Sequence, residues 1–254
     1  MILLKSPEEL SVMRKASRIV AEILAELRKM VAPGVTTDEL DALAERLTLE
    51  SGAHPAFKGY RPRGVVYPKT LCVSINEEIV HGIPSGRKIK AGDIVSLDFG
   101  VVYDGFFGDA AITVPIGKVS GRALKLMEVT RNSLYAAIEH ARVGNRMSDI
   151  SCAVQKTAES AGFSVVEEFA GHGIGRSLHE DPQVPNYFAR GMPNPRLQPG
   201  MVLAIEPMVN EGTARLKILN DGWTAITADG KLSAHFEHSV AITENGPEVL
   251  TEQN

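Results

Sequence analysis

The chain has 254 residues, enough for one large domain or two small ones with a well-buried core. Hydrophobic residues make up 44% and charged residues 23%, which is ordinary for a globular protein. The net charge is -4, the pI is about 6.0 and no basic run stands out, so the composition argues against nucleic-acid or acidic-membrane partners.

Location and redox state follow from what the sequence contains. Cys72 and Cys152 are too few for a secreted disulfide scaffold, so we expect two reduced thiols. The apolar run before Lys5 is too short for a signal-peptide core, and no run approaches the roughly 20 apolar residues that span a bilayer. We therefore expect a cytoplasmic protein with no membrane partner.

Two helices are predicted first. Residues 6–9, SPEE, combine a capping serine, a first-turn proline and the glutamate of a capping box. Apolar residues then recur at helical spacing as far as Leu27, and Pro33-Gly34 ends the helix. A second helix is predicted from Thr36 to Gly52.

Strands follow, and then two more helices. The run Leu71–Ile75 is β-type, and residues 93–114 predict a hairpin that turns at Asp104-Gly105. Helices are predicted over residues 122–142 and 148–162.

The rest of the chain is expected to mix loops and strands. Residues 171–200 are rich in Gly and Pro and predict loops, while β-type runs recur at 201–205, 223–227 and 235–243.

The two halves of the sequence resemble each other. Gly34 to Gly52 and Gly144 to Gly162 have equal spacing, and Gly92 and Gly200 each stand six positions before an acidic residue that ends a similar run. An internal duplication is the simplest account, with chance similarity as the alternative. The predicted fold class is α+β, with helices packed on a curved, mostly antiparallel sheet. We expect a single catalytic domain over residues 1–254, with pseudo-symmetric halves of roughly 1–118 and 119–254.

Asp98 and Asp109 are the first candidate pair for chemistry. If the hairpin turns at Asp104-Gly105, position 98 lies opposite position 111, and residue 109 shares the face of residue 111. Two solvated strand aspartates are the alternative, but Asp is depleted from strands and these two sit among apolar residues.

Glu206 and Glu237 meet the same difficulty at the ends of apolar runs, because a buried carboxylate needs a cation or a partner. Each alone could pair with Arg or Lys. Four such carboxylates together are better explained by a metal such as Mg²⁺, Mn²⁺ or Fe²⁺.

Three histidines lie in Gly-rich or turn-like surroundings: His81 in VHGIP, His172 in GHGIG and His179 in LHEDP. A lone histidine is more often structural than functional, but three beside a carboxylate-rich set favour function. His54 and His140 lack that context and are interpreted as structural.

Several segments together resemble the type I methionine aminopeptidases, in their short bacterial form, over nearly the whole chain. They are SINEEIVHGIP, AGDIVSLDFG with FFGDAA, GHGIGRSLHEDP, PGMVLAIEP, and DGWTAIT with FEHSVAIT. The resemblance implies the internally duplicated "pita-bread" fold. It also implies a monomeric metalloaminopeptidase that removes the N-terminal methionine of nascent polypeptides, near the ribosome, and binds no DNA.

The same resemblance implies two divalent ions per chain, with Co, Mn, Fe, Zn and Mg all open. Asp98, Asp109 and Glu237 would hold one ion. The other would lie among a second, overlapping set: Asp109, His172, Glu206 and Glu237.

The resemblance also implies a substrate site. His81 and His179 would face the substrate, with His179 stabilising the oxyanion, while Glu206 would help move the proton of the attacking water. The implied methionine pocket includes Tyr60, Tyr67, Cys72 and Trp223.

Two departures from the family pattern affect this pocket. The stretch of residues 61–66 looks longer than usual, and Leu178 replaces an aromatic residue.

The alternation of side chains along the strands suggests which residues limit the size of the second substrate residue, the one that follows the methionine. Met208 follows Glu206 by two and His235 precedes Glu237 by two, so both point to the metal side if the strands are regular. We expect these two side chains to form a wall that admits only small second residues. The alternative is that Met208 is an ordinary core residue and His235 a surface residue. For each residue taken alone, that alternative has nearly equal weight.

Two other functions compete with this prediction. A prolidase or an aminopeptidase P resembles the ligand set but usually has a large extra N-terminal domain, for which a first helix at Ser6 leaves no room. A non-catalytic binding protein of the same fold would be expected to lose ligands, whereas all five are kept.

Overall fold

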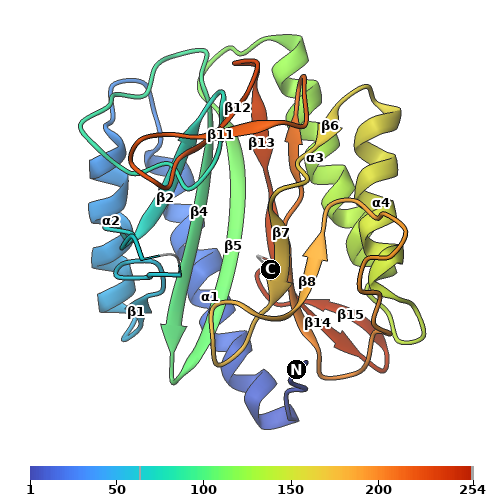
Figure 1. Cartoon of the computed structure of the whole chain (residues 1–254). Helices are drawn as coiled ribbons and strands as arrows, with labels where there is room; N and C mark the ends of the chain where they lie inside the picture. Colours follow the sequence, from blue (N-terminus) through green and yellow to red (C-terminus); the bar gives the residue numbers. More distant parts are fainter. Residues whose placement is uncertain (63, 253–254) are drawn as a thin grey trace.

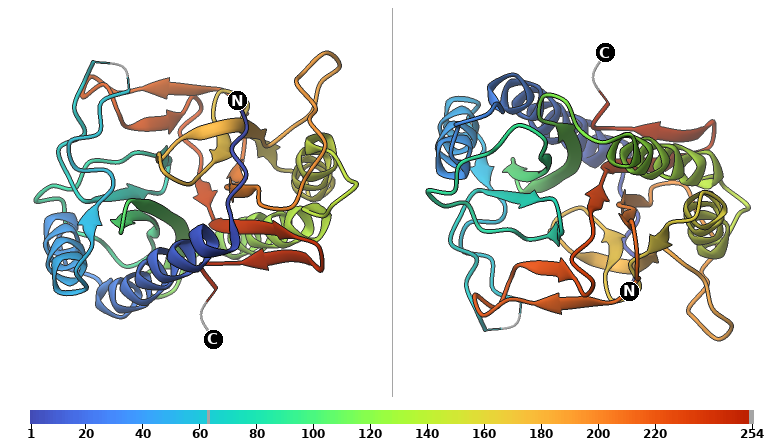
Figure 2. Two further views of the ribbon diagram at one scale, coloured as in Figure 1. Left: turned by 90° about the horizontal axis from the view of Figure 1, so that it is seen from below. Right: turned by 90° about the horizontal axis from the view of Figure 1, so that it is seen from above.

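The computed structural model describes residues 1–62 and 64–252, which form a layer of helices packed on a curved sheet (Figure 1). The helices are α1 (Pro7–Met30), α2 (Thr37–Glu50), α3 (Gly121–His140) and α4 (Met147–Ser160). Seen end-on, α1 and α3 lie behind the centre of the sheet, with α2 and α4 toward its edges (Figure 2). None of the described helices is long and apolar enough to cross a membrane.

The large sheet has the path β1-β4-β5-β14-β9-β7-β8, with β2 added beside β4 and β15 beside β14, and all its pairs are antiparallel. Its strands are β1 (His54–Pro55), β2 (Leu71–Ile75), β4 (Ile94–Tyr103), β5 (Phe106–Pro115), β7 (Ala170–Gly173), β8 (Glu180–Pro185), β9 (Val202–Ile205), β14 (Glu237–Thr243) and β15 (Gly246–Val249).

Two small three-stranded sheets complete the described structure. One contains β6 (Ser164–Val165), β10 (Met208–Asn210) and β13 (Ser233–His235). The other contains β3 (Glu78–Val80), β11 (Leu216–Ile218) and β12 (Ala225–Thr227).

The predicted starts of the first two helices are confirmed by their caps. Ser6 Oγ accepts from the Glu9 N–H, and the Glu9 carboxylate accepts from the Ser6 N–H. Thr36 and Glu39 repeat this capping box at the start of α2. Each box satisfies backbone donors that a helix N-terminus otherwise leaves unpaired, so sequence alone locates these ends well.

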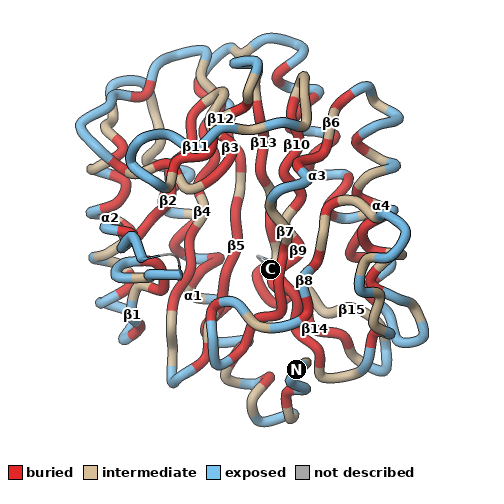
Figure 3. Tube along the Cα trace, in the orientation of Figure 1, coloured by how far each residue is buried: buried red, intermediate tan, exposed pale blue. Residues whose placement is uncertain are grey.

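Alternation along the strands separates the core from the opposite face. Leu97 and Phe99 point to the helices and join the apolar cluster under α1 and α2, while Asp98 between them points away. Leu203 and Ile205 of β9 do the same under α3 and α4. The side chains that point away from the helices form a second face of the sheet, and Figure 3 shows the central strands buried along most of their length.

The prediction of loops over residues 171–200 was wrong in part. Residues Ala170–Gly173 form β7 and Glu180–Pro185 form β8. Gly and Pro are depleted from strands, so their density concealed both elements.

The prediction of one continuous run over residues 235–243 was also wrong. The chain breaks at Phe236, whose N–H donates to the Pro207 carbonyl at 3.4 Å, and so β13 and β14 belong to different sheets.

Candidate active site

Strand register places the acidic residues on one face of the sheet. Asp98 of β4 and Glu237 of β14 are both cross-strand partners of Ala111 on the intervening β5. Asp109 lies two positions from Ala111 and therefore points to the same side. The diagonal arrangement of Asp98 and Asp109 expected from the sequence agrees with this register.

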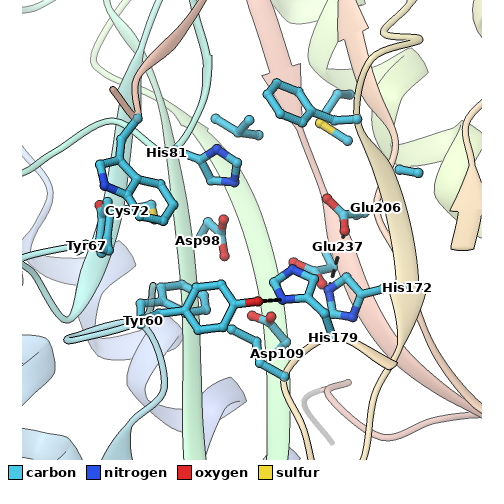
Figure 4. A pocket seen from close by; sticks show the side chains of 17 residues that line it. Tyr60, Tyr67, Cys72, His81, Asp98, Asp109, His172, His179, Glu206 and Glu237 are labelled. Carbon is cyan, nitrogen blue, oxygen red and sulfur yellow. Dashed lines mark hydrogen bonds and ion pairs between the residues drawn. The ribbon is translucent and has the colours of Figure 1, made fainter. Parts of the chain in front are cut away.

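The other half of the chain supplies two more side chains to this face. His238 pairs with Ile205, so Glu206, one residue beyond, continues the row of Glu237. His172 pairs with Ala204, which shares the face of Glu206. Figure 4 shows all five side chains directed into one cavity, whose volume is about 120 Å³.

The two glycines beside His172 have a steric role. A Cβ on Gly171 would stand 2.3 Å from the Ala204 carbonyl oxygen, and one on Gly173 would stand 2.3 Å from the Asp181 carbonyl oxygen. Only glycine lets β7 approach its neighbours this closely. The motif GHG therefore fixes the backbone that presents the imidazole.

A hydrogen bond sets which nitrogen of His172 is available. Its Nδ1 lies 2.9 Å from the Gly173 carbonyl oxygen, which can only accept, so Nδ1 donates. Burial lowers the pKa of His172 to about 3, which keeps the ring neutral. Nε2 then presents a lone pair toward the carboxylates, the form in which histidine binds metals.

The cluster has the donor set and the unsatisfied atoms of a cation site. One donor atom each of Asp109, His172 and Glu237 lies within 4.8 Å of the others. Among the described residues, Asp109 Oδ1 and Glu237 Oε1 are buried without hydrogen-bond partners. Carboxylate oxygens with one imidazole suit a divalent metal, so these residues fit one.

The charges of the cluster favour a bound cation as well. Burial raises the pKa of Asp98 to about 7 and that of Glu206 to about 8. Burial, and then repulsion by the neighbouring carboxylates, holds the pKa of Asp109 and Glu237 well above the usual range. Four ionised carboxylates in this volume need positive charge beside them.

His179 faces the cavity next to His172, with ring centroids 4.1 Å apart. Its Nδ1 is 2.6 Å from the Tyr60 hydroxyl, and the two rings stack (Figure 4). Both residues line the cavity, and Leu178 packs beside them in the apolar cluster.

His81 enters the cavity from a strained backbone. Its φ is 62°, in the left-handed region that non-glycine residues rarely adopt. The ring meets Phe169 and Trp223 edge-on, at centroid distances of 5.3 and 6.0 Å. A non-glycine residue held in this conformation at a cavity supports a functional interpretation.

An apolar recess adjoins the acidic cluster. Tyr67 and Cys72 are buried, and Tyr67 meets Trp223 edge-on at 5.1 Å. Cys72 is the cross-strand partner of Asp98, so the recess opens directly onto the carboxylates. Both cysteines are free thiols, and burial raises the pKa of Cys72, which keeps that thiol neutral.

The two candidates for the second-residue wall lie in different places. Met208 is fully buried and lines the cavity. His235 is also buried, which excludes a surface position, but it is not among the residues lining the cavity. Its Nε2 lies 3.6 Å from Glu206 Oε2, so His235 approaches a carboxylate of the site without lining the cavity.

Sequence reasoning missed four further lining residues: Phe57, Val80, Phe169 and Ala170. Phe57 and Phe169 lie outside every quoted motif, and no spacing signal marked them. Val80 lies within the quoted VHGIP motif, where only the histidine was considered, and Ala170 directly precedes GHGIG, so attention to the neighbours of each histidine could have found both.

Comparison with known proteins assigns the chain to a family. The model of metallopeptidase family M24 matches residues 11–244. The chain is 53% identical to methionine aminopeptidase 1 of Bacillus subtilis (strain 168) over 253 residues, covering 99% of each chain. It is 52% identical to the methionine aminopeptidase of Clostridium perfringens, again with 99% of each chain covered.

Solved structures give the same result for the fold. A methionine aminopeptidase from Thermotoga maritima has a TM-score of 0.95 and 48% identity, with 100% of both chains covered. A prolidase from Pyrococcus horikoshii OT3 has a TM-score of 0.79 at 23% identity, and the match covers 65% of that longer chain, so it shows the fold alone. The expected pita-bread fold is confirmed, and the chain belongs to metallopeptidase family M24 and, within it, to the methionine aminopeptidases.

Proposed function

We propose that the protein removes the N-terminal methionine from polypeptides whose second residue is small. The observation that supports this most directly is the pairing of Cys72 with Asp98, which sets the apolar recess against the acidic cluster. A methionine side chain in the recess brings its own peptide bond over the carboxylates. Position near the reacting groups is itself a large part of catalysis.

Two divalent ions are proposed as cofactors. Asp98, Asp109 and Glu237 would hold one, and Asp109, His172, Glu206 and Glu237 the other. A divalent metal at such a site lowers the pKa of water and polarises the scissile carbonyl. Calorimetric titration of metal-stripped protein with Mn²⁺ measures the number of ions per chain, and a stoichiometry of one would contradict the two-ion proposal.

The chain's own residues then supply the remaining chemistry. Glu206, at the rim of the cluster, accepts the proton of the attacking water. His179 donates to the substrate carbonyl oxygen as negative charge develops on it. His81 lies across the cavity, where it can orient or protonate the leaving amide.

A substrate comparison tests the proposal. We expect the Mn²⁺-loaded protein to cleave Met-Ala-Ser, to cleave Leu-Ala-Ser poorly and to leave Gly-Pro intact. Faster cleavage of Gly-Pro would favour a prolidase-like activity, and no cleavage of any peptide would favour a binding protein. Either result would overturn the assignment.

The proposed function also leads to proposals about the source of the substrates, the location of the protein, its oligomeric state and its domain organisation. Methionyl N-termini arise during translation, so the substrates are nascent chains, met in the cytoplasm near the ribosome. We propose that the protein acts as a monomer and that residues 1–254 form one catalytic domain, since both halves contribute ligands. The pocket segment of residues 61–66 includes position 63, which lies outside the described residues.

A further inference from the structure

The two halves of the site meet along a short seam. β4 and β5 present Asp98 and Asp109, while Glu237 is on β14 and the other two ligands are on or beside β7 and β9. Only two register pairs join β5 to β14 within the described structure, Ala111 with Glu237 and Ala110 with His238. The spacing between the two half-sites therefore depends on this seam.

A side-chain hydroxyl extends the seam at one end. Ser239 Oγ donates to the Asp109 carbonyl oxygen at 2.8 Å and accepts from the Asp109 N–H at 3.2 Å. Continuing the register from Glu237 and Ala111, Ser239 is the cross-strand partner position of Asp109. One hydroxyl thus satisfies both backbone polar groups of the residue opposite.

The other end of the seam repeats the arrangement with the strands exchanged. Thr113 Oγ1 donates to the His235 carbonyl oxygen at 2.7 Å and accepts from the His235 N–H at 3.0 Å. These two positions are also partners when the register is continued. The Ser96 hydroxyl lies 2.8 Å from Thr113 Oγ1 and completes its hydrogen bonding.

Each of these hydroxyl clamps replaces backbone bonds that the diverging strands do not make. Ser239 has no exposed surface and Thr113 is 4% exposed, so water is not available to satisfy the groups they bind. Buried backbone groups without partners are costly, and therefore each clamp holds the opposite strand at a defined separation. The clamp at Ser239 acts on the backbone of Asp109 itself.

We propose that Ser239 and Thr113 are positioning residues for the metal site. Ser239 fixes the Asp109 carboxylate, and Thr113 fixes the segment that leads through Phe236 into Glu237. Together they set the separation of the half-sites. This inference rests on the proposed function, because it assigns the clamps to the same metal-binding carboxylates.

Three full-length variants test the clamps. Ser239→Ala and Thr113→Val remove a hydroxyl, and Ser239→Thr keeps one. The matched control is Ser133→Ala, because Ser133 is also fully buried but donates to the Thr130 carbonyl within α3. For each protein, Mn²⁺ affinity is measured by calorimetry after metal removal, and the folded fraction by circular dichroism at the same temperature.

The expected result is Mn²⁺ binding about 10–100-fold weaker in Ser239→Ala, a loss typical of groups that orient metal ligands. Ser239→Thr should return toward wild type, and Thr113→Val should weaken binding. Ser133→Ala should lower the melting temperature but leave affinity unchanged. Unchanged affinity in folded Ser239→Ala would overturn the proposal. If Ser239→Ala does not fold, unchanged affinity in Thr113→Val would overturn it.

Failure of the proposed function would look different. Wild-type protein that binds no Mn²⁺, or binds it without cleaving Met-Ala-Ser, would refute the function. The clamp proposal fails only when wild type binds and cleaves normally and the hydroxyl variants bind equally well.

Discussion

The hydroxyl of Tyr60 lies 2.6 Å from Nδ1 of His179. Burial raises the pKa of Tyr60 and lowers that of His179, so a neutral phenol donates to a neutral imidazole. The remaining ring proton is then on Nε2, where it can be donated to the substrate. His172 has the opposite arrangement, because its Nδ1 donates to the Gly173 carbonyl. The two adjacent histidines thereby offer different ring atoms, an N–H at Nε2 of His179 and a lone pair at Nε2 of His172.

Tyr60→Phe removes the group that fixes the His179 tautomer. A single hydrogen bond contributes about 0.5–1.5 kcal/mol, so we expect kcat on Met-Ala-Ser to fall about 2- to 12-fold. Metal content, measured by plasma emission spectrometry, should not change. An unchanged kcat would show that the tautomer is set in another way.

His179→Ala removes the proposed oxyanion donor. We expect kcat to fall by about 10²–10³ with a smaller change in KM, as for other oxyanion donors. The variant should retain its metal, and His140→Ala, at the exposed end of α3, serves as the control. Loss of bound metal would mean that His179 is a ligand instead.

Met208→Ala tests the wall against the second substrate residue. Packing clashes cost about 1–3 kcal/mol, so the kcat/KM ratio of Met-Val-Ser to Met-Ala-Ser should rise about tenfold or more. Met147→Ala, the same truncation at the buried start of α4, should leave the ratio unchanged.

His235→Ala gives a separate expectation, because His235 lies near the Glu206 carboxylate but does not line the cavity. It should lower kcat/KM for both peptides without changing their ratio. If the kcat/KM ratio of Met-Val-Ser to Met-Ala-Ser changes only in His235→Ala, then His235 and not Met208 limits the second substrate residue.

A buried ion pair joins the N-terminal segment to Glu180, the first residue of β8, which directly follows His179. Lys5 Nζ lies 2.6 Å from Glu180 Oε2, and both side chains are 5% exposed. Breaking a buried pair leaves an uncompensated charge, so Lys5→Met should cost about 3–5 kcal/mol in the free energy of unfolding. Lys5→Met with Glu180→Gln should recover most of that loss in urea denaturation. A cost below about 1 kcal/mol would be the behaviour of a surface pair.

The sequence predicted the parts of the molecule that local rules govern. Helix caps at Ser6 and Thr36 and the turn at Asp104-Gly105 are local, so the helices and the β4–β5 hairpin were confirmed. It did not predict β7, because the reason for Gly171 and Gly173 is the distance to other strands. Strand register placed Asp98 and Asp109 together within one hairpin.

Long-range packing accounts for the other differences. His235 is held by Thr113, and Phe236 donates to the Pro207 carbonyl. Both partners lie far from residues 235–236 in the sequence, so local patterns could not predict the burial of His235 or the break at Phe236. Whether a residue such as Phe57 or Phe169 lines the cavity likewise depends on how segments distant in sequence pack together.

The most direct test of the central claim is kcat/KM for Met-Ala-Ser before chelation, after exhaustive chelation and after Mn²⁺ is restored. In the proposed function the carboxylates of Asp98, Asp109, Glu206 and Glu237 hold the divalent ions. Chelation should therefore abolish cleavage, and Mn²⁺ should restore it. The melting temperature should fall and recover in parallel, since the metal binds the folded state. Full cleavage by protein shown to be free of metal would contradict the account.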